Sequence, residues 1–197
     1  MTWDTQETRR RLKQAACEEF TARGPDGTTM ARIAARAGIN KERLYNYFGD
    51  KRQLFETVLV EELENLAISL GANAPGLGNI GEWTGCIFDY HAENPYLIRL
   101  LLWEGLSDGP AVNDRARTAH YQRTVAMFAE AQRDGRLNDD LDPAKLVFLL
   151  IGLAAWWFAV PQLSRMLTGS DGSASMERRL RRACVVRAAQ HLASPRP

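Results

Sequence analysis

The 197-residue sequence has little of what most metal sites and enzyme active sites require. Its three cysteines, Cys17, Cys86 and Cys184, are far apart, odd in number and outside any C-x-x-C pair, and it has only three histidines. This spacing disfavours a disulfide framework and a zinc site, and it favours buried thiols. G-x-S-x-G, a P-loop, H-E-x-x-H and a glycine-rich nucleotide turn are also missing. We therefore expect no enzyme activity, no metal and no cofactor.

The sequence also lacks an obvious membrane segment. The first residues, MTWDTQETRRRLKQ, are polar and charged and contain no apolar core of a signal peptide. The longest apolar run, LVFLLIGLAAWWFAV at 146–160, has fifteen residues, fewer than the roughly 20 that span a bilayer. A helix that is apolar on every face is more often buried in a core or an interface. We expect a cytoplasmic protein with no membrane partner.

Sustained period-two alternation, which marks strands, is absent, and helical spacing dominates the chain. Breaks rich in glycine, proline and aspartate separate the segments. The pattern predicts an all-α fold with helices at about 4–23, 28–37, 40–47, 51–70, 82–92, 95–106, 114–132, 143–167 and 175–192. Pro161 should kink the longest C-terminal helix.

Charge is distributed unevenly although the net charge is only +1. Residues 1–52 hold 11 Lys or Arg and 7 Asp or Glu, a net of +4, whereas residues 53–197 hold 14 and 17, a net of −3. This asymmetry indicates a basic N-terminal module on a mildly acidic body. An ordinary solvated basic face would produce the same counts.

Residues 28–48 have the pattern of a helix, a tight turn and a second helix. Gly38 can adopt the left-handed conformation that such a turn needs. Leu44 and Phe48, four positions apart, face inward and leave the donors Lys41, Arg43, Tyr45, Asn46 and Tyr47 toward solvent or the flanks. A helix with one anchoring stripe and one stripe of donors suits the DNA major groove. Two packed helices with a basic surface are the alternative explanation.

The stretch TTMARIAARAGINKERLYNYFGDKRQLF, 28–55, resembles the N-terminal signature of the TetR family of one-component transcriptional regulators. Shared features are the leading threonines, the Ala37-Gly38 turn, the run from Leu44 to Phe48, and Leu54-Phe55. AACEEFTARG, 15–24, also matches, so the resemblance covers about 55 residues. It implies an all-α homodimer in which each subunit presents a recognition helix to one half of a palindromic double-stranded DNA operator.

The resemblance also implies which side chains touch DNA. Lys41, Arg43, Tyr45 and Asn46 fall where the family contacts bases and phosphates. The remaining matched positions fall where it contacts the DNA backbone: Tyr47, Lys51, Thr29 and Arg32. Glu42 departs from the small residues common at its position; it can point outward, orient Arg43 or Lys41, or accept from a cytosine amine, and repulsion by phosphates favours the first two.

The C-terminal half suggests a dimer interface and an effector pocket. The helix expected at 143–167 is apolar on nearly every face, so some of its side chains should meet a partner subunit, unless its own chain surrounds it. The interface candidates are Phe148, Trp156, Trp157, Leu180, Cys184 and Ala188. Rings between 82 and 132 could line a pocket for an apolar ligand, although each alone is more often core: Trp83, Phe88, Tyr90, His91, Tyr96, Trp103, Tyr121 and Phe128.

Taken together, these patterns predict a helix-turn-helix DNA-binding domain at 1–50, followed by a helical effector-binding and dimerisation domain at 51–197. The expected function is a one-component regulator, a repressor by the family's usual behaviour, that is released from its operator by a small, largely apolar effector. The helix at about 51–70 should transmit the signal. Two alternatives stay open: a ligand-binding or scaffold protein that does not act through DNA, and an activator of the same fold.

Overall fold

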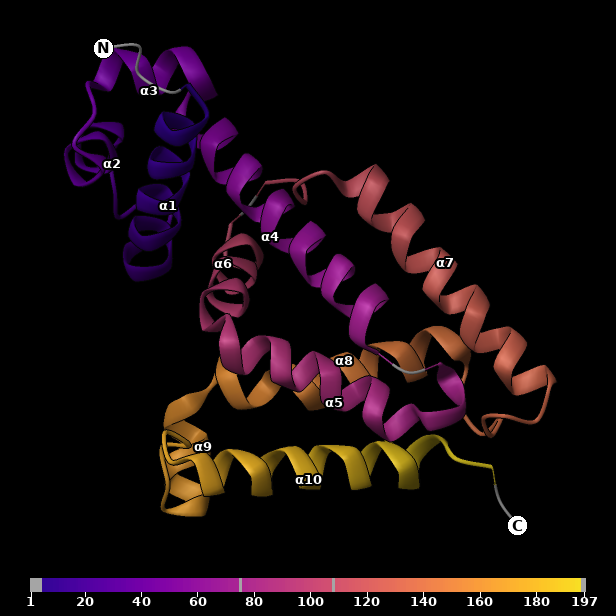
Figure 1. Cartoon of the computed structure of the whole chain (residues 1–197). Coiled ribbons are helices and arrows are strands. Elements are labelled where there is room, and N and C mark those ends of the chain that lie inside the picture. The colour runs from indigo at the N-terminus through magenta and orange to yellow at the C-terminus, as the bar shows by residue number, and fades with distance from the viewer. Residues whose placement is uncertain (1–4, 75, 108, 196–197) are drawn as a thin grey trace. The chain divides into compact units, whose positions relative to one another are not determined.

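The structure, a computed structural model, describes residues 5–74, 76–107 and 109–195, and within these ranges it is helical and contains no strand. The prediction of an all-α fold is therefore confirmed. Figure 1 shows the order of the elements: α1 (Thr5–Arg23), α2 (Met30–Ala37), α3 (Lys41–Phe48), α4 (Lys51–Asn73), a 3-10 turn η1 (Leu77–Asn79), α5 (Ile80–Glu93), α6 (Pro95–Gly105), α7 (Asp114–Arg133), α8 (Pro143–Ala159), α9 (Pro161–Thr168) and α10 (Ser175–Ala193).

Helix α8 begins where the sequence places a cap. The Asp142 side chain accepts hydrogen bonds from the backbone amides of Ala144 and Lys145 at 3.1 and 3.2 Å. Pro143 occupies the first turn of the helix, where its missing N–H leaves no hydrogen bond unmade. A local signal therefore fixes this helix start.

The helix expected at 143–167 is two helices, which corrects the prediction of a single kinked one. Helices α8 and α9 are bent by 84° at Val160. A residue that precedes proline is pushed out of the α region, and Val160 has φ −129° and ψ 61°. Pro161 then starts α9 as its first residue. Among the described helices none alone is long and apolar enough to cross a membrane, and only this bent pair reaches the required length and composition.

The chain divides into two compact units. The head unit consists of Met1–Asn65 and Tyr96–Asn113, and the body unit consists of Leu66–Pro95 and Asp114–Pro197. By contacts, therefore, α6 belongs with the first helices, and α4 contributes residues to both units. The boundary predicted at residue 50 does not coincide with this division, and as a functional boundary it stays a prediction.

Contacts between α6 and the end of α1 explain the extent of the head unit. Gly24 has a φ of +71° and no side chain, and the Trp103 ring lies so close that a Cβ on Gly24 would be 2.8 Å from it. Arg99 Nε donates a hydrogen bond to the backbone oxygen of Thr21 at 3.0 Å. The core above this contact includes Phe20 and Phe55, whose rings meet edge to face at 5.2 Å.

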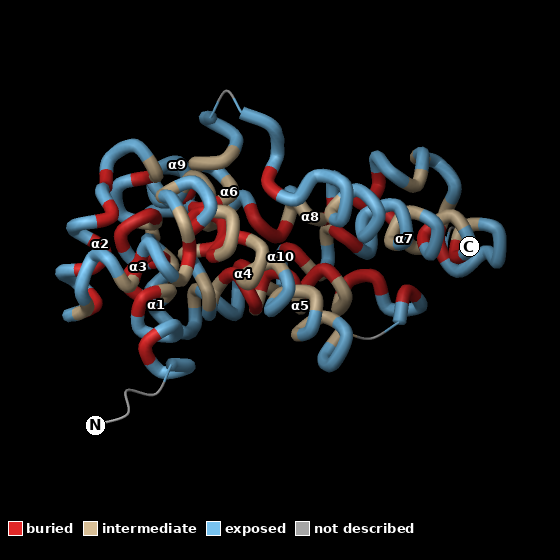
Figure 2. Tube along the Cα trace, turned by 90° about the horizontal axis from the view of Figure 1, so that it is seen from above, coloured by how far each residue is buried: buried red, intermediate tan, exposed pale blue. Residues whose placement is uncertain are grey.

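The body unit is built on the packing of α5 against α8 and α10. Buried positions recur along one side of these helices (Figure 2). Helix α10 approaches α5 closely, because a Cβ on Gly81 would lie 2.9 Å from the backbone oxygen of Val186. Arg182 of α10 adds ion pairs to Glu82 and Asp89 of α5 at 2.8 and 2.7 Å. Apolar burial and one part-buried charge cluster thus hold this unit together.

Candidate nucleic-acid interface

A left-handed turn at Gly38 sets the geometry between α2 and α3. Gly38 has φ 64° and ψ 34°, and its N–H bonds to the carbonyl oxygens of Ala34 and Ala35. The Ile39 N–H bonds to the Ala34 oxygen at 3.0 Å, which completes a Schellman-type helix end. Arg11 of α1 also donates to the Ala37 oxygen at 2.6 Å. The turn is therefore satisfied from both sides.

Helix α3 is anchored by one face and exposed on the other. Asn40 caps it by accepting from the Glu42 N–H at 2.8 Å. Leu44 and Phe48 are buried, as the sequence predicts. Lys41, Tyr45 and Asn46 are exposed, and Arg43 and Tyr47 are half-buried. The side chains expected to reach DNA therefore line the side of the helix away from the core.

The exposed side of α3 carries a stacked cation. The Lys41 ammonium lies 5.6 Å from the centroid of the Tyr45 ring, a distance at which a cation and a ring attract each other. Tyr45 is 44% exposed, unusual for so large a ring. The pair presents an ammonium, a phenol hydroxyl and an aromatic face to solvent, groups that phosphates and bases can accept.

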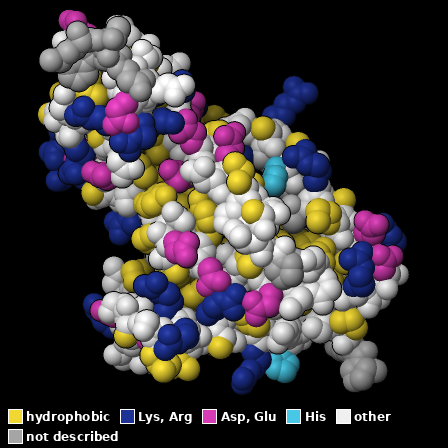
Figure 3. All heavy atoms as spheres, in the orientation of Figure 1, with side chains coloured by type: hydrophobic (Ala, Val, Ile, Leu, Met, Phe, Trp, Pro, Cys, Tyr) yellow, Lys and Arg dark blue, Asp and Glu magenta, His cyan; other side chains and the backbone are white. Residues whose placement is uncertain are grey.

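The remaining predicted DNA-contacting residues surround the start of α2 and α4. Thr29 caps α2, and its hydroxyl accepts from the Arg32 N–H at 3.3 Å, which leaves the O–H able to donate. Lys51 Nζ lies 3.4 Å from the Thr28 carbonyl oxygen and is half-buried. Figure 3 shows Lys and Arg side chains, with carboxylates between them, over the surface of α1–α3.

Glu19 is the residue that the sequence analysis missed. It is buried and accepts from Thr28 Oγ1 at 2.9 Å, Arg36 Nε at 2.8 Å and Arg32 Nε at 3.4 Å. Burial alone would raise the pKa of its carboxyl group, but the bonds from Thr28 and Arg36 outweigh it, so the pKa lies below its usual range. The signal was present, because Glu19 lies seven positions after buried Leu12, on the apolar face of α1.

The predicted effector residues divide between the two units. Tyr96 and Trp103 belong to the head unit and the other six to the body unit. Phe88, Tyr90, His91 and Phe128 are buried in the body core, whereas Tyr121 is 39% exposed. Trp83 is half-buried and stacks edge to face on Phe128 at 5.2 Å. The eight rings therefore do not line a single cavity in the described part of the chain.

His91 differs from the other buried rings because it can carry a proton. Its ring lies 6.1 Å from Phe158, and among the described residues Nδ1 has no hydrogen-bond partner. Burial lowers the pKa of His91 to about 4, so the imidazole is neutral near pH 7. This position therefore contributes a polar atom inside an apolar cluster.

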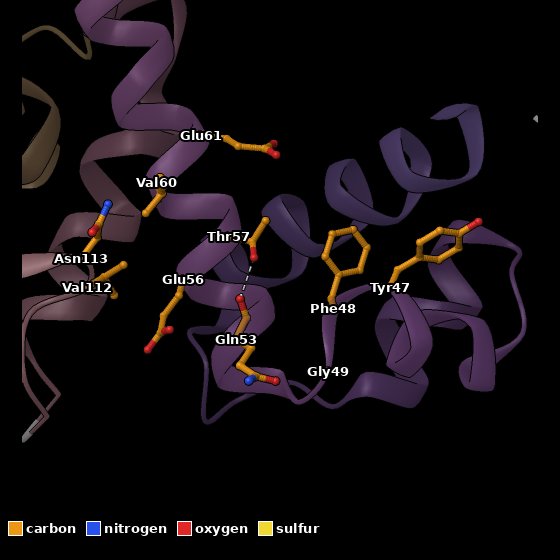
Figure 4. A pocket seen from close by; sticks show the side chains of 10 residues that line it. All are labelled: Tyr47, Phe48, Gly49, Gln53, Glu56, Thr57, Val60, Glu61, Val112 and Asn113. Atoms are coloured by element: carbon orange, nitrogen blue, oxygen red, sulfur yellow. Dashed lines mark hydrogen bonds between the residues drawn. The ribbon is translucent and has the colours of Figure 1, made fainter. Parts of the chain in front are cut away.

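A groove of about 740 Å³ lies within the head unit, beside the recognition helix (Figure 4). Its walls come from the end of α3, from α4 and from the segment before α7: Tyr47, Phe48, Gly49, Gln53, Glu56, Thr57, Val60, Glu61, Val112 and Asn113. Both carboxylates are already paired, Glu56 with Arg52 at 3.0 Å and Glu61 with Lys13. None of the eight predicted effector residues lines this groove.

The interface candidates form rows on α8 and α10. Phe148 and Trp156, eight positions apart on α8, are 76% and 57% exposed. On α10, Leu180 is 58% exposed and Cys184 is exposed. Trp157 and Ala188 are half-buried, and the Arg181 guanidinium lies 5.2 Å from the Trp157 ring centroid. Large apolar side chains thus face solvent on two neighbouring helices of one subunit.

Comparison with known proteins agrees with this geometry. The profile described as "Bacterial regulatory proteins, tetR family" matches residues 12–58, and "Tetracyclin repressor-like, C-terminal domain" matches residues 79–191. The chain belongs to the TetR family. It is thus a TetR-family transcriptional regulator, which confirms the resemblance read from 28–55 and points to a regulatory DNA-binding protein rather than an enzyme.

Individual relatives extend the comparison. The HTH-type transcriptional repressor SCO4008 of Streptomyces coelicolor is 39% identical over 168 residues, which covers 84% of this chain and 86% of the relative. The HTH-type transcriptional activator FasR of Mycolicibacterium smegmatis is 28% identical over 77% of this chain and 72% of its own. The crystal structure of SCO4942 from Streptomyces coelicolor has a TM-score of 0.81 at 30% identity and covers 96% of this chain and 99% of that one.

Proposed function

We propose that this TetR-family regulator is a repressor that binds a palindromic operator as a homodimer and is released by a small, largely apolar effector. The observation that carries the proposal is α3 itself: two buried side chains anchor it while Lys41, Tyr45 and Asn46 stay exposed. Repression is favoured over activation because the repressor SCO4008 is 39% identical. We expect the regulator to meet its operator in the cytoplasm.

The division of labour among the DNA contacts follows from their chemistry. Lys41, Arg43, Tyr45 and Asn46 would enter the major groove, where Arg and Lys donate to guanine and Asn pairs with adenine. Tyr47, Lys51, Thr29 and Arg32 would bind phosphates and set the register. Functionally, we keep residues 1–50 as the DNA-binding module and 51–197 as the effector-binding and dimerisation module.

The proposed dimer interface is the row of apolar side chains on α8 and α10. Phe148, Gly152 and Trp156 are spaced four residues apart on α8, as are Met176, Leu180 and Cys184 on α10. A two-fold interface places the same patch of each subunit against its copy. Such a dimer would hold two recognition helices roughly 34–36 Å apart, one turn of DNA.

An apolar effector is supported by half-buried side chains in the body unit. Leu70, Trp83, Val125, Ile151 and Leu153 pack against the core clusters and are only partly covered. A ligand that covers such side chains gains hydrophobic free energy. If it binds one conformation of the dimer better, it shifts the population away from the DNA-bound form. Helix α4, which runs through both units, is the proposed transmission element.

The decisive experiment is operator selection. Purified full-length protein is incubated with random duplexes and with DNA from upstream of its own coding sequence, and bound duplexes are amplified and sequenced. We expect an enriched palindrome, bound by two subunits in light scattering. No sequence preference at low salt would favour a ligand-binding or scaffold protein instead.

Activation is the second candidate, because the activator FasR is 28% identical over 77% of this chain. A reporter that carries the selected operator separates the two outcomes. Deletion of the regulator should raise expression if it represses and lower it if it activates.

A further inference from the structure

A buried carboxylate lies at the centre of the helix-turn-helix. The Glu19 side chain is only 3% exposed, although it belongs to the head unit's basic surface region. Glu18 and three arginines accompany it. Arg36 Nε and Arg32 Nε bond to it, and Arg23 Nε lies 3.5 Å from Oε2. Such a charge is tolerated only where hydrogen bonds satisfy it.

The bonds to Glu19 bring together the start and the middle of α2. Oε2 accepts from Thr28, which directly precedes the cap residue Thr29, and from Arg32 in the second turn. Oε1 accepts from Arg36 near the end of the helix. One side chain of α1 therefore fixes α2 along its whole length against α1.

Arg32 keeps its capacity to bind DNA in this arrangement. Its bond to Glu19 is made by Nε, and 49% of the side chain remains exposed. The terminal amino groups can therefore donate to a phosphate while the Nε edge is held. A guanidinium held in this way has less rotamer entropy to lose when it binds an oxyanion.

We propose that Glu19 is a positioning residue for DNA binding, which holds Arg32 and the capped start of α2 as a preformed phosphate-binding unit. The inference rests on the proposed function and adds to it a residue that does not touch DNA. It goes against the simple electrostatic expectation, because a carboxylate near phosphates repels them. Removal of its charge should strengthen DNA binding if charge alone mattered.

The sign of the effect therefore tests the proposal. Operator affinity is measured by fluorescence anisotropy for the wild type, Glu19→Gln and the matched control Glu18→Gln, whose carboxylate is exposed and bonds to Arg36 alone among the arginines. We expect Glu19→Gln to weaken binding roughly tenfold and Glu18→Gln to leave it unchanged or slightly stronger. Binding by Glu19→Gln that equals or exceeds the wild type would overturn the proposal.

Two further readouts separate positioning from a general loss of stability. The slope of log K against log salt should become less steep by about one contact per subunit in Glu19→Gln. The double variant Glu19→Gln/Arg32→Gln should bind no more weakly than Arg32→Gln alone, because both changes remove the same contact. Fully additive losses would contradict the proposal.

A folding control keeps the test decisive. Circular dichroism and thermal unfolding without DNA show whether Glu19→Gln is folded at the assay temperature. If it is not, Thr28→Val removes one donor to Glu19 while keeping the side-chain shape, and a loss of about threefold with a less steep salt slope is expected. An unchanged Thr28→Val would then count against the proposal. Absence of operator binding by the wild type would instead reject the proposed function itself.

Discussion

Glu42 illustrates how a residue that looks misplaced for DNA binding can serve the helix that carries it. It lies in the first turn of α3, its side chain is exposed, and its N–H donates to the Asn40 cap. A carboxylate at this end of a helix interacts favourably with the helix dipole, by about 0.3–1 kcal/mol. The outward orientation favoured from the sequence is consistent with this position, and an orienting role toward Lys41 or Arg43 remains a prediction.

Also at the residue scale, Lys41→Ala combined with Tyr45→Ala should abolish operator binding. Each lost contact is worth about 1–3 kcal/mol, so two per subunit imply a loss of at least roughly 100-fold. Anisotropy with the selected operator measures the loss. Dimerisation and thermal unfolding should not change, and Arg133→Ala, which removes an exposed charge on α7, serves as the control. A dimer lost in the double variant would show that these side chains hold the fold.

His91 predicts a pH dependence of stability. In the unfolded chain histidine binds its proton near pH 6.5, whereas the folded His91 has a pKa of about 4. The unfolded state therefore takes up more protons between these values. Its contribution to the free energy of unfolding is complete above pH 6.5 and is lost as the pH falls toward 4, by on the order of 3 kcal/mol.

Denaturant unfolding between pH 4 and 7 measures this contribution. His91→Phe should have a flatter profile than the wild type, because the titrating group is removed and its unpartnered Nδ1 is replaced by carbon. His191→Gln, at an exposed position, should keep the wild-type profile. Identical profiles for His91→Phe and the wild type would mean that His91 is protonated in the folded state.

At the element scale, the crossing of α5 and α10 depends on glycine. A Cβ at Gly81 would lie 2.7 Å from the Gln190 side chain and 2.9 Å from the Val186 backbone oxygen. Gly81→Ala should therefore lower the free energy of unfolding by about 1–3 kcal/mol, although alanine is the better helix former.

Gly71→Ala is the matched control for that substitution. Gly71 lies in α4 with nothing within 4 Å of an added Cβ, so the change should stabilise the protein by about 0.5–1 kcal/mol. Chemical unfolding of both variants gives the comparison. Similar shifts for the two would show that backbone propensity, and not the close approach of α10, decides the effect.

At the scale of the whole molecule, the exposed rows on α8 and α10 predict a concentration-dependent dimer. Leu180→Glu places a charge in the proposed interface and should convert the protein to a monomer in light scattering. Operator affinity should fall by roughly 100-fold or more, because a single recognition helix reads only a half-site. The control is Met127→Glu on α7, which is 55% exposed and outside the rows. A dimer that persists in Leu180→Glu would place the interface elsewhere.

Local signals determined much of this protein. Gly38, Asn40 and Asp142 specify turns and caps through their own backbone preferences and short hydrogen bonds, so the sequence sufficed for the all-α class, most helix limits and the buried face of α3. The family resemblance over 28–55 rested on the same compact stretch. Such features involve neighbours along the chain, and periodicity expresses them directly.

Only the tertiary structure decided what depends on residues far apart in sequence. The Arg32–Glu19 bond, the Trp103 ring over Gly24 and the crossing at Gly81 join separate helices, and no spacing rule records which helix meets which. The same holds for the head unit, which takes α6 from beyond the predicted boundary at residue 50. Packing of side chains in three dimensions makes these choices, because many helix arrangements bury similar apolar area but few satisfy each buried charge and close approach.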